Sequence, residues 1–387
     1  MKRIYFDHNA TSPVHSGVKD AMLPFLTVKF GNPSSIHWAG REVREHVEEA
    51  RKQVAALINA KPAEVFFTAG GSEGDNMAIK GILLQSIKKG GHVITSAIEH
   101  PAVLKTCRFM ERFGFEITIV PVDGHGMVDP DDVRKAIRKD TLLISIMYVN
   151  NETGNILPLK EITSIGHEHG IPVHTDAVQA IGKIAVNVQE LGIDFLTASG
   201  HKFNAPKGIG FQYIKEGTNV LPLISGGHHE GGFRAGTENV PGIVAIGKAC
   251  EILSRKMDES RKTIGRLRDK LEHGILKSIP ETQLNGHPAQ RVYNTANISF
   301  RYIEGEALLV LLDLDGIALS TGSACASGST EPSHVLRAMN LEPLCSRGAL
   351  RFSLGLGNTE EEVDCCLDVL RQHASKLLAM SPFHKKA

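Results

Sequence analysis

The first half of the chain alternates short runs of β-branched residues with helical periods, and this alternation constrains the fold more than any other feature. Between residues 41 and 60, apolar side chains recur at spacings of three and four, which predicts an amphipathic helix. Short apolar runs predict buried strands at residues 65–68, 92–96, 117–121, 142–149, 171–174, 195–199 and 209–214. Strands that alternate with helices form mostly parallel sheets with helices on both faces. The sequence therefore predicts an α/β fold.

The pattern changes at about Glu238. A long helical period, rich in lysine, arginine and glutamate, runs from there to about residue 279. After it we expect strands near residues 297–300, 317–320 and 350–354, and helices at residues 304–314 and from residue 359 onwards. This second pattern predicts a smaller α+β domain.

Charge and composition exclude some classes of function. The 387 residues include 43 Lys+Arg and 43 Asp+Glu, so we expect no basic surface for nucleic acid or for an anionic membrane. The apolar stretch at residues 307–319 contains Asp313 and Asp315, which makes it too short and too charged to span a bilayer. The six cysteines form no C-x-x-C pair and are sparse for a disulfide scaffold, so we expect a reducing, cytoplasmic location.

Three polar segments follow predicted strands, where open α/β sheets bind their ligands. "SGHKF" (199–203) brings Lys202 to a strand end, "HTDAVQ" (174–179) brings Asp176, and "TAGGSEGDN" (68–76) forms a glycine turn with Ser72 as a plausible N-cap. A lysine can form a Schiff base, and N–H groups at a helix start bind phosphate. The carboxylate can bind a metal, act as a base or face a cationic ring nitrogen. Further metal ligands at fitting spacing are lacking, and so are the P-loop and G-x-G-x-x-G patterns, so we expect neither a metal, ATP nor NAD.

Together these segments fit pyridoxal 5′-phosphate, which needs a lysine for its aldehyde, a carboxylate for its ring nitrogen and an anion site for its phosphate. His100, in "IEHPAV", follows another strand and could stack on the ring. Each residue also has a plainer interpretation. Lys202 could be a solvated lysine, the glycine turn an ordinary helix start, and His100 a helix N-terminal residue before Pro101.

The following motifs occur in order along the chain: "FDHNAT", "FGNPSS", "EHPAVL", "NNETG", "HTDAVQ", "SGHKF", "APKGIG", "RAGTEN", "STGSACASGS", "EPSHVLRAM" and "LRFSLG". With them the chain resembles the pyridoxal-phosphate cysteine desulfurases of the NifS/IscS type, members of the class V aminotransferase superfamily. The resemblance implies the type I fold of pyridoxal-phosphate-dependent transferases. It implies a large domain at residues 15–257 with a mostly parallel seven-stranded sheet, a small domain at residues 1–14 and 258–387, and a homodimer with active sites at the subunit interface.

The resemblance also implies roles for individual residues. Lys202 holds the cofactor covalently, Asp176 pairs with its pyridine nitrogen, Gln179 hydrogen-bonds its phenolic oxygen and His100 stacks on its ring. Asn151 and Arg351 bind the substrate carboxylate, for which a bidentate guanidinium is suited. The residues expected to hold the phosphate are Gly71, Ser72, Ser199, His201 and, from the other subunit, Thr237.

Cys325 is the implied nucleophile, and together with Lys202 and His100 it completes the expected catalytic group. It lies in "STGSACASGST" (320–330), whose small residues favour a mobile loop, although an inert buried thiol is the plainer interpretation. The implied reaction converts L-cysteine to L-alanine and leaves the sulfur on Cys325 as a persulfide. The sulfur then passes to an iron–sulfur scaffold protein or another acceptor.

Two alternatives stay open. One is a selenocysteine lyase or an aminotransferase on the same fold, and the other is a non-catalytic sulfur carrier or scaffold-binding paralogue. Four positions also depart from the usual family pattern. His8 replaces an asparagine, Ser12 and Ser72 each replace a threonine, and Gly231 replaces an arginine near the cofactor entrance.

Overall fold

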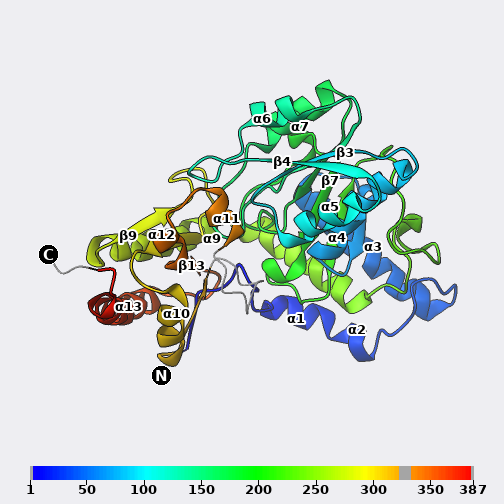
Figure 1. Cartoon of the computed structure of the whole chain (residues 1–387). Helices are drawn as coiled ribbons and strands as arrows, with labels where there is room; N and C mark the ends of the chain where they lie inside the picture. Colours follow the sequence, from blue (N-terminus) through cyan, green and yellow to red (C-terminus); the bar gives the residue numbers. More distant parts are fainter. Residues whose placement is uncertain (1–2, 322–332, 385–387) are drawn as a thin grey trace.

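The computed structural model describes residues 3–321 and 333–384. Its largest element is a seven-stranded sheet with the strand order β2-β8-β7-β6-β5-β3-β4 (Figure 1). Strand β8 is antiparallel to both of its neighbours, and the neighbours from β7 to β4 are parallel. The strands are β2 Val65–Thr68, β3 Gly91–Ser96, β4 Phe115–Val120, β5 Thr141–Ser145, β6 Val173–Asp176, β7 Phe195–Ser199 and β8 Gly210–Ile214. The predicted α/β fold with a mostly parallel seven-stranded sheet is confirmed.

Each of the seven strands overlaps a run that the sequence predicts. The largest difference is at β5, which ends at Ser145 rather than at residue 149. The residues after it are mostly buried, and Ile146 and Tyr148 still donate backbone hydrogen bonds to His174 and Asp176 of β6. The chain then turns, so that Leu157 pairs with Tyr148 and Asn150 pairs with Asn155 through their backbones. An apolar run therefore continues past the end of the strand because the loop itself is buried next to the cavity described below.

Adjacent residues of the central strands enter different hydrophobic clusters, because successive side chains point to opposite faces. Val93, Leu143 and Phe195 pack with helices α4 Gly71–Leu83 and α5 Pro101–Glu111. Their neighbours Ile94, Ile144 and Leu196 belong to the cluster formed with α3 Trp38–Ile58, α7 Leu159–Glu168 and the first part of α9 Val240–Ser278. Helices thus cover both faces of the sheet, as expected for parallel strands.

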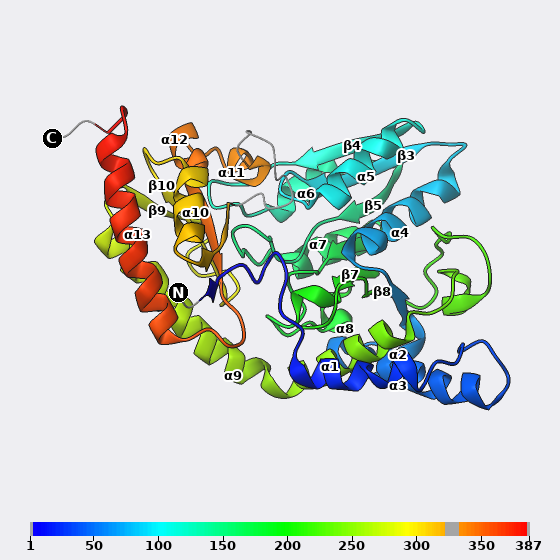
Figure 2. The ribbon, with the colours of Figure 1, turned by 90° about the horizontal axis from the view of Figure 1, so that it is seen from below.

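The second half of the chain forms a four-stranded antiparallel sheet with the order β12-β13-β10-β9. Its strands are β9 Thr282–Asn285, β10 Thr295–Phe300, β12 Ser320–Thr321 and β13 Ala349–Ser353, and a separate two-stranded sheet pairs β1 Ile4–Tyr5 with β11 Ile317–Ala318. Helices α10 Gly305–Leu314 and α13 Glu360–Met380 pack beside these sheets (Figure 2). The sequence predicts all of these strands except β1 and β9, whose short or polar sequences carry no clear strand pattern.

Helix α9 connects the two hydrophobic cores. Its first part, up to Cys250, packs against the large sheet, and its last part, from Ile264 to Ile275, packs into the core of the small sheet. The predicted domain boundary between residues 257 and 258 falls inside this continuous helix, and it stays a prediction. The remaining helices are α1 Ser16–Met22, α2 Pro24–Thr27, α6 Pro130–Ala136, α8 Val188–Leu191, α11 His334–Ala338, α12 Pro343–Arg347 and the 3-10 turns η1 Pro62–Glu64, η2 Leu84–Ser86, η3 Gly200–Lys202 and η4 His229–Gly232.

None of the helices in the described ranges combines the length and the apolar character that a membrane crossing requires.

Gly247 in α9 provides a test of the packing between α9 and α3. A Cβ atom at this position would lie 2.6 Å from the Cα and Cβ atoms of Ala50 in α3. We expect Gly247→Ala to lower the free energy of unfolding by about 1–3 kcal/mol, because the backbones have to separate.

Gly265, in the same helix, is the matched control. Its added Cβ would have its nearest contact at 3.6 Å, with the Tyr293 Cβ atom. Gly265→Ala should therefore raise stability by about 0.5–1 kcal/mol through helix propensity alone. Chemical unfolding of both variants checks the pair, and a Gly247→Ala protein as stable as the parent would contradict this description of the helix contact.

Candidate active site

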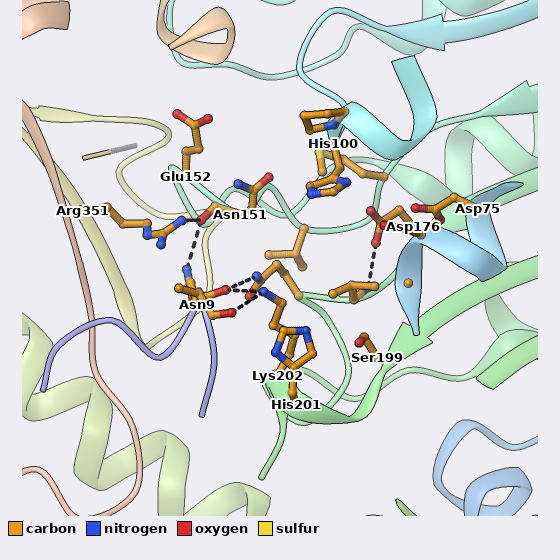
Figure 3. A pocket seen from close by; sticks show the side chains of 18 of the residues that line it. Asn9, Asp75, His100, Asn151, Glu152, Asp176, Ser199, His201, Lys202 and Arg351 are labelled. Carbon is orange, nitrogen blue, oxygen red and sulfur yellow. Dashed lines mark hydrogen bonds between the residues drawn. The ribbon is translucent and has the colours of Figure 1, made fainter. Parts of the chain in front are cut away.

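A cavity of about 320 Å³ opens where the carboxyl ends of the parallel strands meet the small sheet. Its walls come from segments that are far apart in the sequence: the start of α4, the start of α5, the loops after β5, β6 and β7, the N-terminal segment and β13. Open α/β sheets bind ligands at this edge. Figure 3 shows Lys202 between Asp176 on one side and Arg351 on the other.

Lys202 ends the short turn η3 directly after β7, and its side chain is partly buried in the cavity wall. Its Nζ atom donates hydrogen bonds to the backbone oxygens of Asn9 and Ala10, each at 2.8 Å. The predicted placement of this lysine at a strand end is confirmed, and a plainly solvated lysine is not what the structure shows. The amine is held by neutral carbonyl oxygens in a position from which it can react with a carbonyl ligand in the cavity.

Asp176 is the last residue of β6 and is 5% exposed. Its Oδ1 atom accepts a hydrogen bond of 2.9 Å from the backbone N–H of Val178. Burial raises the pKa of the Asp176 carboxyl, while His100, the Val178 N–H and Lys202 act in the opposite direction. A buried carboxylate is stable only beside a cation or several donors, so a protonated ring nitrogen fits this position.

Asp75 lies beside Asp176, although sequence analysis assigned it no role. One polar atom from each of Asp75, His100 and Asp176 lies within 4.8 Å of the other two. Asp75 is 1% exposed, and its Oδ1 atom has no hydrogen-bond partner among the described residues. Burial and the neighbouring Asp176 raise the pKa of Asp75, which favours its protonated form. The upward shift is the larger for Asp75, so the two shifts favour a proton on Asp75 over one on Asp176.

His100 begins a helix, as its plainer interpretation has it, and it also lines the cavity, while stacking on the ring stays a prediction. It is the N-cap of α5, where its Nδ1 atom accepts a hydrogen bond of 3.1 Å from the backbone N–H of Ala102. Its ring also lines the cavity close to Asp176 (Figure 3). Because the helix cap occupies Nδ1, a neutral ring carries its proton on Nε2.

The glycine turn differs from the prediction in one detail. Ser72 is not the N-cap of α4, because the helix begins at Gly71 and the cap is Gly70, with a φ of 151°. This backbone conformation is open to glycine but not to serine, so the cap moves to the glycine. Ser72 sits in the first turn instead, where it lines the cavity with Gly71, Ser199 and His201. First-turn N–H groups and hydroxyls together suit a phosphate.

Arg351 and Asn151 form the opposite end of the cavity. Arg351 is 2% exposed; its Nη2 atom pairs with Asp7 Oδ1 at 2.8 Å, and its Nη1 atom donates to the backbone oxygen of Asn151 at 3.0 Å. Its Nε atom is buried without a hydrogen-bond partner in the described part of the chain. Arg351 and Asn151 both line the cavity, so this end can bind a carboxylate. Asp7, which sequence analysis missed, sets the orientation of the guanidinium.

Like Asp75 and Asp7, Asn9 was assigned no role by sequence analysis, although it lies in the recognised motif "FDHNAT". Its backbone oxygen also accepts a hydrogen bond from Gln179 Nε2 at 2.9 Å, and its Oδ1 atom accepts one from Lys183 Nζ at 2.9 Å. No spacing rule could have found Asn9 or Lys183. The first is about 190 residues from Lys202, and only the folded chain brings them together.

Thr237 is the one predicted residue in the described part of the chain that does not reach the cavity. Thr237 is exposed and is not among the described residues that line the cavity of its own subunit, so its role stays a prediction. Cys325, with its small neighbours, lies outside the described residues.

The positions that depart from the family pattern are accommodated locally. His8 is buried, and burial together with the nearby Lys183 lowers its pKa to about 4, so it stays neutral at pH 7. Ser12 Oγ donates to the backbone oxygen of His201 at 2.9 Å and so ties the N-terminal segment to the lysine turn. Gly231 has a φ of 63°, a conformation that favours glycine over arginine.

Comparison with known proteins assigns this chain to a family. A model of the class-V aminotransferase family matches residues 4–365. The chain is 51% identical over 387 residues to a protein named cysteine desulfurase IscS from Dictyoglomus turgidum, an alignment that covers 100% of this chain and 98% of the relative. The chain belongs to the cysteine desulfurase family. A second member of the family, cysteine desulfurase IscS from Methanosarcina thermophila, is 52% identical over 385 residues, with 100% and 95% covered.

Solved structures agree with this assignment to the cysteine desulfurases. A NifS-like protein has a TM-score of 0.92 at 39% identity, with 97% of this chain and 100% of that chain covered. A structure described as SspA in complex with cysteine has a TM-score of 0.82 at 35% identity, with 92% and 99% covered. Cysteine desulfurases of this family depend on pyridoxal phosphate. The residues of the cavity fit pyridoxal phosphate. The Lys202 amine, the buried Asp176 carboxyl, the His100 imidazole and the first turn of α4, which suits a phosphate, all line the same cavity.

Glu99, directly before His100, generates a pH prediction. It is completely buried, it accepts hydrogen bonds from Ser96 Oγ and Met147 N, and burial raises its pKa from 4.5 to about 8. Because the native state holds the proton more tightly than the unfolded state, Glu99 lowers stability progressively as the pH rises from about 4.5 to about 8.

Glu99→Gln, which imitates the protonated acid, should remove this part of the pH dependence. The check is the free energy of unfolding of the cofactor-free parent and of the variant, measured by chemical unfolding at steps between pH 5 and pH 8. The difference between the two free energies should change with pH. A difference that stays constant over this range would show that Glu99 does not titrate as described.

Proposed function

We propose that this protein is a cysteine desulfurase that takes sulfur from L-cysteine, releases L-alanine and holds the sulfur on Cys325 as a persulfide. The observation that carries the proposal is the position of Lys202 in one cavity between a buried carboxylate, Asp176, and a buried guanidinium, Arg351. Family membership and the structure of a relative in complex with cysteine support the choice of substrate.

The residues around the cavity have different roles in binding the cofactor. Asp176, beside Asp75, would pair with the ring nitrogen and favour its protonated form. Gly71, Ser72, Ser199 and His201 would hold the phosphate, Lys202 would attach the cofactor, and His100 would contact the ring. When bound, pyridoxal phosphate supplies an electron-withdrawing ring that stabilises negative charge at the substrate Cα.

Arg351 and Asn151 orient the substrate through its carboxylate, which leaves the sulfur free for attack. Lys202 Nζ would accept the proton from the substrate Cα and return it. The Cys325 thiolate forms a bond to the substrate sulfur while the carbon–sulfur bond breaks with its electrons on carbon. A proton takes the place of sulfur on that carbon, so cysteine and a thiol become alanine and a persulfide without an external oxidant.

We propose further that the enzyme is a homodimer in which Thr237 completes the phosphate site of the other subunit. Large apolar side chains are unusually exposed between residues 23 and 38, for example Phe30 at 74%, Ile36 at 85% and Trp38 at 67%. Pro33 and Ser34 from this segment line the same surface hollow as His228–Gly231, close in sequence to Thr237. An exposed apolar segment next to the Thr237 loop supports a subunit interface there.

We propose that the sulfur acceptor is an iron–sulfur scaffold protein or another sulfur carrier, as the names of the IscS relatives suggest. A cytoplasmic location fits the five described cysteines, all of which are free thiols.

The persulfide is the most direct test of the function. When the pyridoxal-phosphate-loaded enzyme receives one equivalent of L-cysteine, we expect one sulfur atom on the Cys325 peptide and one alanine released per active site. Cys325→Ala should keep the visible absorbance of the bound cofactor but acquire no sulfur, because the attacking thiol is missing. Peptide mass spectrometry and alanine analysis measure both outcomes.

Two controls separate the alternatives. Cys365→Ala, which removes an exposed thiol, should behave as the parent, and Lys202→Ala should lose the absorbance and the reaction. Turnover that persists in Cys325→Ala would indicate an aminotransferase, and labelling with selenocysteine but not with cysteine would indicate a selenocysteine lyase. A persulfide found on Cys345, Cys365 or Cys366 but never on Cys325 would overturn the proposal.

The shared site can be tested by mixing inactive chains. Thr237→Asp should repel the phosphate of the partner site, and Lys202→Ala removes the attachment point, so each homodimer should be inactive. In a heterodimer, one of the two sites has an intact lysine and an intact threonine, and we expect about half of the parent activity per heterodimer. Activity of the mixture no higher than that of the separate variants would rule out the shared site.

A further inference from the structure

Lys183 is a buried lysine that contacts Asn9 and Gln179, two residues that line the cavity, and the proposed reaction gives it no task. It is 6% exposed and lies in the turn that follows β6, four residues after Gln179. Its Nζ atom donates hydrogen bonds to Asn9 Oδ1 at 2.9 Å and to Gln179 Oε1. Both acceptors belong to neutral amides, which is an unusual environment for a buried lysine.

The contact with Lys183 determines which way the Gln179 amide points. A lysine ammonium can only donate, so it pairs with the oxygen of the amide and would face an N–H donor if the amide were reversed. The other end of the amide, Nε2, donates to the backbone oxygen of Asn9 at 2.9 Å. Oxygen and nitrogen are therefore each held by a separate partner.

The Asn9 backbone oxygen accepts hydrogen bonds from both Gln179 and Lys202. Lys202 Nζ donates to the same Asn9 oxygen at 2.8 Å, so the amide nitrogen of Gln179 lies next to the reactive amine. The Nε2 atom has two hydrogens, and only one is used by Asn9. Gln179 lines the cavity, so the second N–H is available to a ligand atom beside the carbon that Lys202 attacks.

The charges around Lys183 do not alter this arrangement. Burial, Lys202 and Arg351 all lower the pKa of Lys183. His8 also faces this amine and is itself kept neutral. A neutral amine keeps two N–H groups for Asn9 and Gln179. Its lone pair could accept from a reversed amide, but that reversal would turn the amide oxygen toward the Asn9 backbone oxygen.

We propose that Lys183 is a positioning residue that locks the Gln179 amide with its nitrogen toward the cofactor oxygen next to the carbon held by Lys202. The inference rests on the proposed use of pyridoxal phosphate. In that cofactor, a phenolic oxygen lies beside the aldehyde carbon, and an N–H donor stabilises its ionised form. The locked amide therefore lowers the pH at which the bound cofactor takes up a proton, whereas a reversed amide would present its oxygen and raise that pH.

A double-variant experiment tests the inference by the midpoint pH of the visible absorbance of the bound cofactor. We expect Lys183→Met to raise the midpoint by about one pH unit, a tenfold change in proton affinity, and Gln179→Leu to raise it similarly. If Lys183 acts through the amide, Lys183→Met should add nothing in the Gln179→Leu background. The exposed Lys160 provides the control, because Lys160→Met removes a lysine without moving the midpoint.

Two other results would overturn the inference. Equal shifts from Lys183→Met with and without the Gln179 amide would mean that Lys183 acts through its charge, and no shift in either background would mean that it has no effect on the cofactor. Lys183→Arg keeps the N–H donors and should keep the midpoint close to that of the parent, which provides a measurement if Lys183→Met folds poorly. The titration needs no cysteine and no turnover, so an enzyme that binds the cofactor but releases no sulfur would still decide it.

Discussion

The hydrogen bonds of Asn9 connect the two halves of this protein. The residue is 2% exposed, and on one side its backbone N–H and its amide bind Ser353, Thr295 and Asn294 of the small sheet region. On the other side, its two oxygens accept hydrogen bonds from Gln179 and Lys183, which follow β6, and from Lys202, which follows β7. A single polar residue in the interior has to satisfy all of its donors and acceptors, and here it does so with partners from both halves. The position of the reactive amine therefore depends on how the N-terminal segment passes between the two sheets.

Charge is separated across the cavity. Asp75, Asp176 and Glu99 lie at the α4 and α5 end, where burial raises the pKa of each carboxyl group. Lysines and Arg351 lie at the other end, where burial lowers the pKa of Lys183. Buried groups of like charge favour neutral forms, and Asp7 already pairs with Arg351, so a ligand charge at each end adds to the compensation that the chain itself supplies. A ligand with a cationic ring nitrogen at one end and a substrate carboxylate at the other satisfies both ends at once.

Sequence patterns predicted the strands of the large sheet because buried strands have apolar sequences. Apart from the edge strand β4, the strands of the large sheet are short and buried in their centres, so an apolar run such as residues 195–199 identifies its strand without knowledge of its neighbours. The sequence did not predict β9, because it lies at an edge of its sheet and has only one large apolar residue, Leu284. The N-cap of α4 was placed on Ser72 because serine is a good cap, but the unusual φ of Gly70 took precedence.

The sequence by itself determined the α/β class, the strands, and the residues at the strand ends, because each of these depends on local patterns and on the resemblance of ordered motifs. Only the tertiary structure decided which side chains meet. Asp75 is one turn into α4, Asp7 and Asn9 come from the N-terminal segment, and Lys183 follows Gln179, and none of them has a local signature of its role. Their importance arises from burial beside one another, where hydrogen bonds and charges are strong because water is excluded. That proximity is a property of the packed chain, and no segment of the sequence contains it.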